Sequence, residues 1–550
     1  MSGLAIALLP VPALADTMVV NVDGITLDER GQPRRFSALQ FTPEGKVKAL
    51  YQAKDKRPKT EYQIDGKGRV MIPGLIDAHL HVMEVGFGAL TLDLSETRSL
   101  GEAQAKIAAF AKAHPERAWI VGRGWNQELW GLGRFPTAAE LDAVVADRSV
   151  WLARIDGHAG WANRAALAAA GVTAATRDPA GGRIERLANG APAGVLVDDA
   201  AGLVDRAVPP PRPEDRDLAF DTAQRLLVAR GLTAVADMGT SIEDWQAFRR
   251  AGDLGRLRIR IMSYALGVEN MAVIGGPGPS PWLYGDRLRL NGVKLYSDGA
   301  LGSRGALLKA PYADAQQTRG IAGIDETQLK NLMSRAAMDN FQIAVHAIGD
   351  AANTRVLDAF ADLSATYKGD RRWRIEHAQV LDPADIPRFG RIGVIASMQP
   401  IHQVSDRTMA EARLGPGRLA GAYVWRSLAA SGARLAFGSD APFDLLDPFA
   451  GMAAAVTRED ASGQPAGGWQ PQERIDRTTA LAGYTTAAAW AGFAEGRFGR
   501  LAPGLAADFV FLDADPLLSP PEALRRTRVL ETWIGGVKVY EAKVDAVPRR

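Results

Sequence analysis

Eight short apolar segments recur through the middle of the chain, and a stretch with helical character follows each of them. This strand-then-helix order is typical of a parallel sheet, because parallel strands need a long crossover between them. The order therefore predicts an α/β fold, a (β/α)8 TIM barrel over residues 73–496. The strand candidates are Val70–Ile76, Thr233–Asp237, Leu257–Met262, Leu288–Leu295, Gln342–His346, Arg374–His377, Gly393–Met398 and Arg434–Gly438.

A chain of 550 residues is longer than such a barrel needs. The gap between the first and second strand candidates is too long for one crossover, so residues of about 85–215 are expected to form an insertion. The insertion has strand candidates of its own at Trp119–Gly122 and Val150–Ile155. Residues 16–72 and 497–545 carry short alternating stretches separated by turn signals. They predict one small composite β-sandwich domain built from both termini.

The first residues resemble a secretory signal. An apolar run over Leu4–Pro12 is followed by Ala13-Leu14-Ala15, an A-x-A cleavage pattern. The run is shorter than the roughly 20 residues of a membrane span. Residues 1–15 are therefore expected to be a signal peptide and the protein to be exported, in the periplasm. The alternative is a simple apolar tail, because no Lys or Arg precedes the run.

Composition limits the partners and the chemistry. The formal charge is +2 and no Lys/Arg block stands out, so neither nucleic acid nor a membrane surface is expected as a partner. A small-molecule substrate is expected, and a homodimer is left open. Cysteine is absent, which excludes a thiolate metal site and a cysteine nucleophile. A metal would need His, Asp, Glu or a modified side chain, and the chain has seven His.

Two of these histidines, His79 and His81, end the first strand candidate. Residues i and i+2 of an extended chain point to the same side, so both imidazoles can face one point. Such a pair suits a metal like zinc. The alternative is a polar pair on the surface, which the preceding apolar run disfavours.

Four further residues fall at the corresponding ends of other strands. Active sites of (β/α)8 barrels gather at the carboxyl ends of the strands. Each of these residues alone has an ordinary explanation, a core histidine or an ion-paired lysine, but their joint placement favours one site. They are Lys294 on the fourth strand, His346 on the fifth, His377 on the sixth and Asp440 after the eighth.

The motifs around these residues resemble the amidohydrolase superfamily, and in particular the branch called amidohydrolase family 3. The resemblance extends over nearly the whole chain after residue 16. The motifs are Pro73–His81, Asn291–Gly299, Val345–Asp350, Glu376–Gln379, Gly438–Pro442, Gly499–Gly504 and Ala507–Phe509.

The resemblance implies a binuclear centre of two divalent ions, with zinc the expected metal. His79, His81 and Asp440 would bind the buried ion, while His346 and His377 would bind the more exposed one. Lys294 would be carboxylated by CO2 and bridge both ions. Nearby cations favour this step, because they lower the pKa of the amine that must be neutral to react. The alternative is a lysine paired with a carboxylate such as Asp298.

The implied mechanism is attack of a metal-bridging hydroxide on a carbonyl carbon. Asp440 would take the proton of the water and pass it to the leaving amine. Five further residues are expected near the substrate, either in glycine- and tryptophan-rich motifs of the insertion or after the barrel strands. They are His158, Trp125, His402, Asp298 and Arg304. For His158, a purely structural role in holding a loop is the alternative.

The preferred function is hydrolysis of a non-peptide C–N bond in an amide, a formamide or an N-acyl compound. A deaminase with one metal ion is the main rival, with His377 as proton donor and Lys294 as a free amine. An ester or lactone hydrolase on the same scaffold is also open, since fold alone does not decide the reaction. A binding or regulatory protein without turnover is disfavoured by the intact ligand set.

Overall fold

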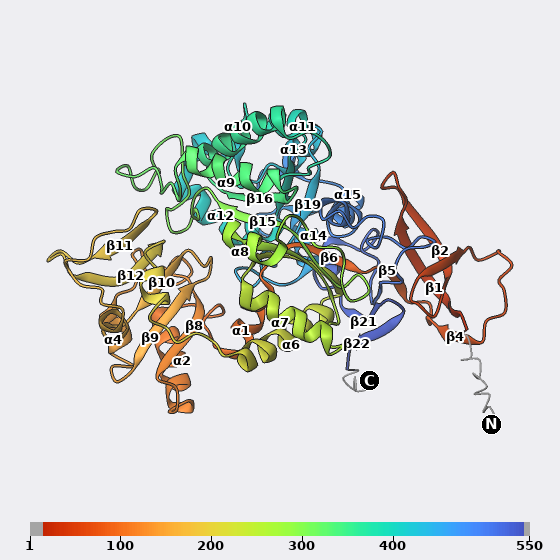
Figure 1. Ribbon diagram of the computed structural model, residues 1–550, viewed down its shortest axis with the longest axis horizontal. Helices are drawn as coiled ribbons and strands as arrows, with labels where there is room; N and C mark the ends of the chain where they lie inside the picture. Colours follow the sequence, from red (N-terminus) through yellow and green to blue (C-terminus); the bar gives the residue numbers. More distant parts are fainter. Residues whose placement is uncertain (1–14, 544–550) are drawn as a thin grey trace, which may run out of the picture.

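The computed structural model describes residues 15–543. At its centre, eight parallel strands follow one another around a nearly closed sheet in the order of the chain (Figure 1). These strands are almost wholly buried, as expected when helices cover the outside of a parallel sheet. They are β6 (Leu75–Leu80), β13 (Leu232–Thr240), β14 (Arg260–Leu266), β15 (Leu288–Tyr296), β16 (Gln342–Ala347), β17 (Arg374–His377), β18 (Ile395–Met398) and β19 (Leu435–Phe437). The predicted (β/α)8 fold is confirmed.

The last barrel strand, β19, is joined to the first, β6, by hydrogen bonds just after β19 ends. The backbone N–H of Asp440, after β19, donates to the carbonyl of His79 on β6 at 2.7 Å. The backbone N–H of Ser439 donates to the buried carboxylate of Asp77 at 3.0 Å. These bonds bring the two ends of the sheet together at the side where the predicted site residues lie.

Several of the helices between and after the strands begin at side-chain caps. Ser241, for example, caps α7 through a reciprocal pair of bonds with Asp244. The helices of the barrel region are α6 (Pro213–Ala229), α7 (Ile242–Asp253), α8 (Gly267–Gly275), α9 (Glu326–Met338), α10 (Asp350–Thr366), α11 (Ile386–Ile392), α12 (Pro400–Leu414), α13 (Trp425–Ala430), α14 (Pro448–Thr457), α15 (Arg477–Gly483) and α16 (Thr486–Ala491), with 3-10 turns η1 (Pro416–Gly421) and η2 (Pro471–Glu473).

The first strand candidate, Val70–Ile76, is divided in the structure, which corrects the prediction of one strand. Its first half, β5 (Val70–Pro73), belongs to the terminal sheet, and the barrel strand begins only at Leu75. Gly74 separates the two where the chain passes close to β13, since a Cβ there would lie 2.2 Å from Thr233 Oγ1. The break lets one stretch of chain serve two sheets.

Strands from both termini form one continuous hydrogen-bonded sheet, in the order β22-β21-β20-β5-β1-β2-β3, with β4 paired to β1. The two ends of the chain meet where β5 runs antiparallel to β20. Arg260 of β14 ties this sheet to the barrel through a buried ion pair with Asp508, at 2.7 Å. Besides β5, the strands are β1 (Thr17–Leu27), β2 (Pro33–Phe41), β3 (Val47–Tyr51), β4 (Tyr62–Asp65), β20 (Phe509–Leu512), β21 (Val529–Ile534) and β22 (Val537–Glu541). Helix α17 (Pro521–Arg525) lies between β20 and β21 in the chain.

The insertion between β6 and β13 has its own six-stranded sheet, in the order β11-β12-β10-β9-β8-β7. The two strands predicted for it correspond to β8 and β9. Figure 1 shows the insertion and the terminal sheet on opposite sides of the barrel. The elements are α1 (Val82–Leu90), β7 (Leu92–Asp93), α2 (Leu100–Ala113), β8 (Trp119–Trp125), α3 (Ala138–Asp142), β9 (Ser149–Arg154), β10 (Ala159–Ala162), α4 (Arg164–Ala169), β11 (Gly182–Arg186), β12 (Pro192–Asp198) and α5 (Gly202–Asp205).

None of the helices described over residues 15–543 combines the length and the apolar character that crossing a bilayer requires. The expected signal peptide, residues 1–15, lies outside the described residues except for its last one.

Candidate metal centre

The six predicted ligands converge at the carboxyl ends of the barrel strands. Asp440 Oδ1 lies 3.2 Å from His79 Nε2 and 3.2 Å from His81 Nε2. Lys294 Nζ, from β15, lies 3.2 Å from the same nitrogen of His79. The rings of His79 and His377 are 4.7 Å apart. His346 completes the cluster, because its ring lies 4.5 Å from that of His377.

His79 lies between two buried carboxylates. Its Nδ1 lies 2.6 Å from Glu376 Oε2, and a carboxylate can only accept, so Nδ1 carries a proton. When the ring is neutral, its lone pair is at Nε2, which lies 3.2 Å from Asp440 Oδ1 and 3.2 Å from Lys294 Nζ. Two electron pairs that face each other in a buried site are stabilised by a cation between them.

Three further histidines of the cluster have lowered pKa values, which favours the neutral form that metal binding requires. Burial lowers the pKa of His81 to about 4. It also lowers the pKa values of His346 and His377 well below their usual range. Neutral imidazoles offer a lone pair, which is the form in which histidine binds metals. Within the described residues, His79, His377 and Asp440 have donor atoms within 4.8 Å of one another. The donor set fits a divalent ion such as zinc.

Lys294 is enclosed at the centre of this cluster. Its side chain is fully buried, with the residue 1% exposed, and burial lowers the pKa of its amine to about 8. The amine contacts His79 and lies 4.9 Å from the centre of the Tyr296 ring. No ion pair joins it to Asp298 in the described part of the chain. The alternative of a simple Lys294–Asp298 pair therefore has no contact to support it.

Glu376 is a functional candidate that sequence reasoning missed. It accepts a short hydrogen bond from Arg374 Nε and holds His79 through Nδ1. Burial opposes ionisation, yet the charge of Arg374 and the bond from His79 lower the pKa of Glu376 to about 2. The available signal was its position two residues after Arg374 on β17. Alternate residues of a strand share a face, so the two buried side chains lie on the same side of β17.

We expect Glu376→Gln to weaken metal binding about 10- to 100-fold, because partners that orient a ligating histidine contribute about that much. The glutamine keeps the shape but lacks the charge that holds the proton on His79 Nδ1. Competition with a chelator of known affinity measures the change. Glu522→Gln, on the exposed side of α17, is the matched control. Equal metal affinity in both variants would contradict this role of Glu376.

Three of the expected substrate residues lie beside the cluster: His402, His158 and Asp298. His402, in α12, has its Nε2 3.7 Å from Asp440 Oδ2 and its Nδ1 2.9 Å from Gln379 Nε2. His158, from the insertion, has its ring 5.1 Å from the ring of His346. The insertion therefore reaches the mouth of the barrel.

Asp298 Oδ1 lies 3.6 Å from His346 Nε2, whereas Arg304 and Trp125 have different surroundings. The carboxylate of Asp298 accepts from the backbone N–H groups of residues 307, 348 and 349, so it organises the loops after β15 and β16. Arg304 pairs with Asp314 at 2.8 Å. Trp125 is 0% exposed and donates to the carbonyl of Leu152. Trp125 thus belongs to the core of the insertion and not to the wall of the cluster.

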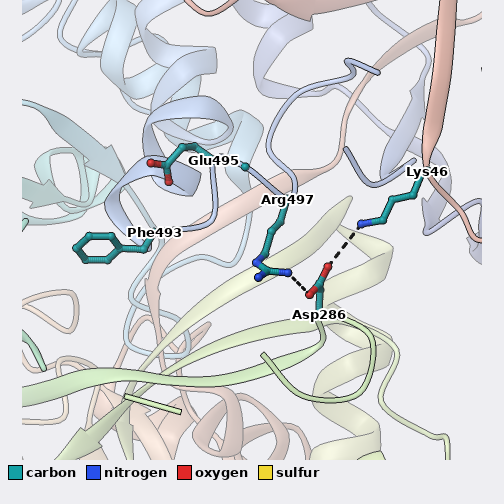
Figure 2. Close-up of a pocket in the computed structure, with 6 residues that line it drawn as sticks. Lys46, Asp286, Phe493, Glu495 and Arg497 are labelled. Carbon is teal, nitrogen blue, oxygen red and sulfur yellow. Dashed lines mark hydrogen bonds and ion pairs between the residues drawn. The ribbon is translucent and has the colours of Figure 1, made fainter. Parts of the chain in front are cut away.

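A separate cavity of about 470 Å³ lies at the opposite end of the barrel. It is lined by charged pairs that join the barrel to the terminal sheet: Figure 2 shows Arg497 and Lys46 directed at Asp286. Asp286 precedes β15, so this cavity is at the amino ends of the strands. None of the six clustered residues lines it.

Comparison with known proteins agrees with this geometry. A sequence model of the amidohydrolase family matches residues 63–540. The chain is 34% identical over 496 residues to Protein LONG AFTER FAR-RED 3 of Arabidopsis thaliana, covering 87% of this chain and 83% of that protein. It is 34% identical over 494 residues to the putative amidohydrolase YtcJ of Bacillus subtilis, covering 88% and 91%.

Two further matches bear on the chemistry. The chain is 27% identical over 559 residues to an N-substituted formamide deformylase of Arthrobacter pascens, covering 96% of this chain and 99% of that protein. Its structure resembles that of an uncharacterized metal-dependent hydrolase from Pyrococcus horikoshii, with a TM-score of 0.74 and 26% identity, covering 92% and 99%.

Proposed function

The chain belongs to the amidohydrolase family, in the branch called family 3, and from this premise we propose that it hydrolyses a non-peptide C–N bond in an amide, a formamide or an N-acyl compound. The observation that carries the proposal is Asp440, whose Oδ1 lies 3.2 Å from both His79 Nε2 and His81 Nε2 beside a buried lysine. The full-length similarity to an N-substituted formamide deformylase supports formamides as the first substrates to test.

In this proposal the cluster holds two divalent ions, with zinc favoured by the histidine and carboxylate donors. His79, His81 and Asp440 would bind one ion, and His346 and His377 would bind the other. When bound, such ions lower the pKa of a water molecule toward neutral and polarise a carbonyl oxygen.

Lys294 would hold the ions as a carbamate. Its neutral amine would form a bond to the carbon of CO2 and release one proton to solvent, which would leave an anionic oxygen ligand. The lowered pKa of about 8 supports this step, because a larger share of the amine is then neutral. The surroundings of the amine support it as well, since no carboxylate within residues 15–543 makes a hydrogen bond or ion pair with Lys294 Nζ, which contacts His79.

Asp440 acts on the proton. Its carboxylate accepts a proton from the attacking water and returns it to the nitrogen as the C–N bond breaks. Oδ1 faces His79 and His81, so Oδ2 is the oxygen left for this exchange. His402 Nε2 lies 3.7 Å from Oδ2, on the side of α12.

The test is hydrolysis of a small panel by protein loaded with zinc and bicarbonate. We expect amine release from N-butylformamide or N-butylacetamide, with formamides hydrolysed faster. Ammonia release from amino-substituted heterocycles, without amide hydrolysis, would overturn the proposal in favour of the one-metal deaminase. Hydrolysis of butyl formate and butyrolactone alone would favour the ester or lactone hydrolase.

A further inference from the structure

The insertion contributes a histidine to the mouth of the barrel and holds it firmly. His158 lies between β9 and β10, and Asp198 ends β12 on the same sheet. His158 extends the row of imidazoles in the cluster, since its ring is 5.1 Å from that of His346, and that ring is 4.5 Å from His377. A substrate with its carbonyl beside His346 and His377 therefore presents its next atoms to His158.

Asp198 is seated tightly against a barrel loop. A Cβ at Gly299 would lie 2.5 Å from Asp198 Oδ1, and a Cβ at Gly305 would lie 2.3 Å from Asp198 Oδ2. Only glycine leaves room for the carboxylate at both places. The backbone of Asp198 also has a φ of 49°, the left-handed region that costs energy for residues with a side chain. The strained backbone of Asp198 and the close fit of its carboxylate together indicate that the position of this carboxylate matters for function.

The carboxylate decides which nitrogen of His158 carries a proton. His158 Nδ1 lies 2.8 Å from Asp198 Oδ1, and since the carboxylate only accepts, Nδ1 must donate. In the neutral ring the lone pair is then at Nε2.

The remaining nitrogen is available to a ligand. Among the described residues, none makes a hydrogen bond to His158 Nε2, and the side chain keeps 19% of its surface exposed. Nε2 is thus an oriented acceptor beside the cluster. An acceptor suits a substrate with an N–H group and repels the lone pairs of an ester oxygen.

We propose that His158 Nε2 accepts a hydrogen bond from the N–H of the scissile nitrogen, so that the site selects secondary amides over N,N-disubstituted amides and esters. The proposal rests on the proposed function and adds the substrate class. Asp198 is the positioning residue that fixes the tautomer. Sites built to bond a substrate N–H or O–H discriminate strongly against analogues that lack it.

Three matched probes test the selectivity: N-butylformamide, N-butyl-N-methylformamide and butyl formate, assayed at about pH 9, which is above the ordinary histidine pKa of about 6.5. We expect Asp198→Asn to reduce the preference for N-butylformamide over the other two by about 100-fold. The asparagine amide can donate to Nδ1, which moves the ring proton to Nε2 and turns the acceptor into a donor. Asp199→Asn, which changes the neighbouring exposed carboxylate, should leave the preference unaltered.

A second variant and a second measurement guard against misfolding. His158→Phe removes the acceptor and should lose the same preference while keeping its metal content. In protein labelled with 15N-histidine, the signal lost in His158→Phe should show a ring protonated at Nδ1 in the wild type and at Nε2 in Asp198→Asn. An unchanged preference in both variants, or a wild-type ring protonated only at Nε2, overturns this inference and leaves the proposed function standing. Failure of the wild type to hydrolyse any of the three probes overturns the proposed function and this inference with it.

Discussion

Replacing Lys294 by alanine is expected to lower the bound metal from about two ions per chain to about one or fewer, and to abolish measurable hydrolysis. The carbamate is the ligand that both ions share in the proposed centre, so its loss removes one donor from each ion. The side chain is buried and lies 3.2 Å from His79. Elemental analysis measures the change in protein purified with bicarbonate and without a chelator.

Lys330→Ala is the matched control for this experiment. Lys330 lies on α9 and pairs with Asp362 at the surface, so its loss should alter neither the metal content nor hydrolysis. About one ion in the wild type, and the same in Lys294→Ala, would contradict the bridged centre. That result would favour the deaminase in which Lys294 stays a free amine.

The second large effect is expected at Asp440. Asp440→Asn should reduce kcat/KM for an amide by about 10³-fold or more, because the amide cannot take the proton from water and pass it to the leaving nitrogen. Asparagine keeps an oxygen near His79 and His81, so the metal content should fall less than in Lys294→Ala. Steady-state kinetics and metal analysis of the same preparation measure both quantities.

Asp444→Asn separates this effect from a general change in the loop after β19. Asp444 accepts from Ser405 and lies in the same loop, but it makes no contact with His79 or His81 within residues 15–543. Its kcat/KM should stay near that of the wild type. Nearly normal hydrolysis by Asp440→Asn would contradict the role of this carboxylate as the proton carrier.

The barrel could be predicted because its signals are local. Each strand is a short apolar run, and the predicted ligands stand at the ends of these runs, where parallel strands bring their side chains to one edge. The division of Val70–Ile76 could not be predicted, because both halves have the same apolar pattern. The partner that draws Val70–Pro73 away is β20, whose sequence lies more than 430 residues further along the chain.

Part of the candidate site could likewise be predicted from the sequence, and part could not. The motifs around His79, His346 and Asp440 indicated ligands because residue type and strand position together restrict the chemistry. Trp125 was expected near the substrate, yet its indole is enclosed in the insertion core. The residue type does not tell a tryptophan in a core from one in a lid. Only the packing of the insertion around Trp125 decides between the two.

The sequence by itself determined the fold class, the family and the identity of the six clustered side chains, since these depend on local periodicity and on motifs at strand ends. Only the tertiary structure decided which groups hold those side chains. Glu376 meets His79 across 297 residues of sequence, and Asp198 meets His158 across 40. A hydrogen bond needs atoms about 3 Å apart in a defined direction, which the order of residues along the chain does not determine.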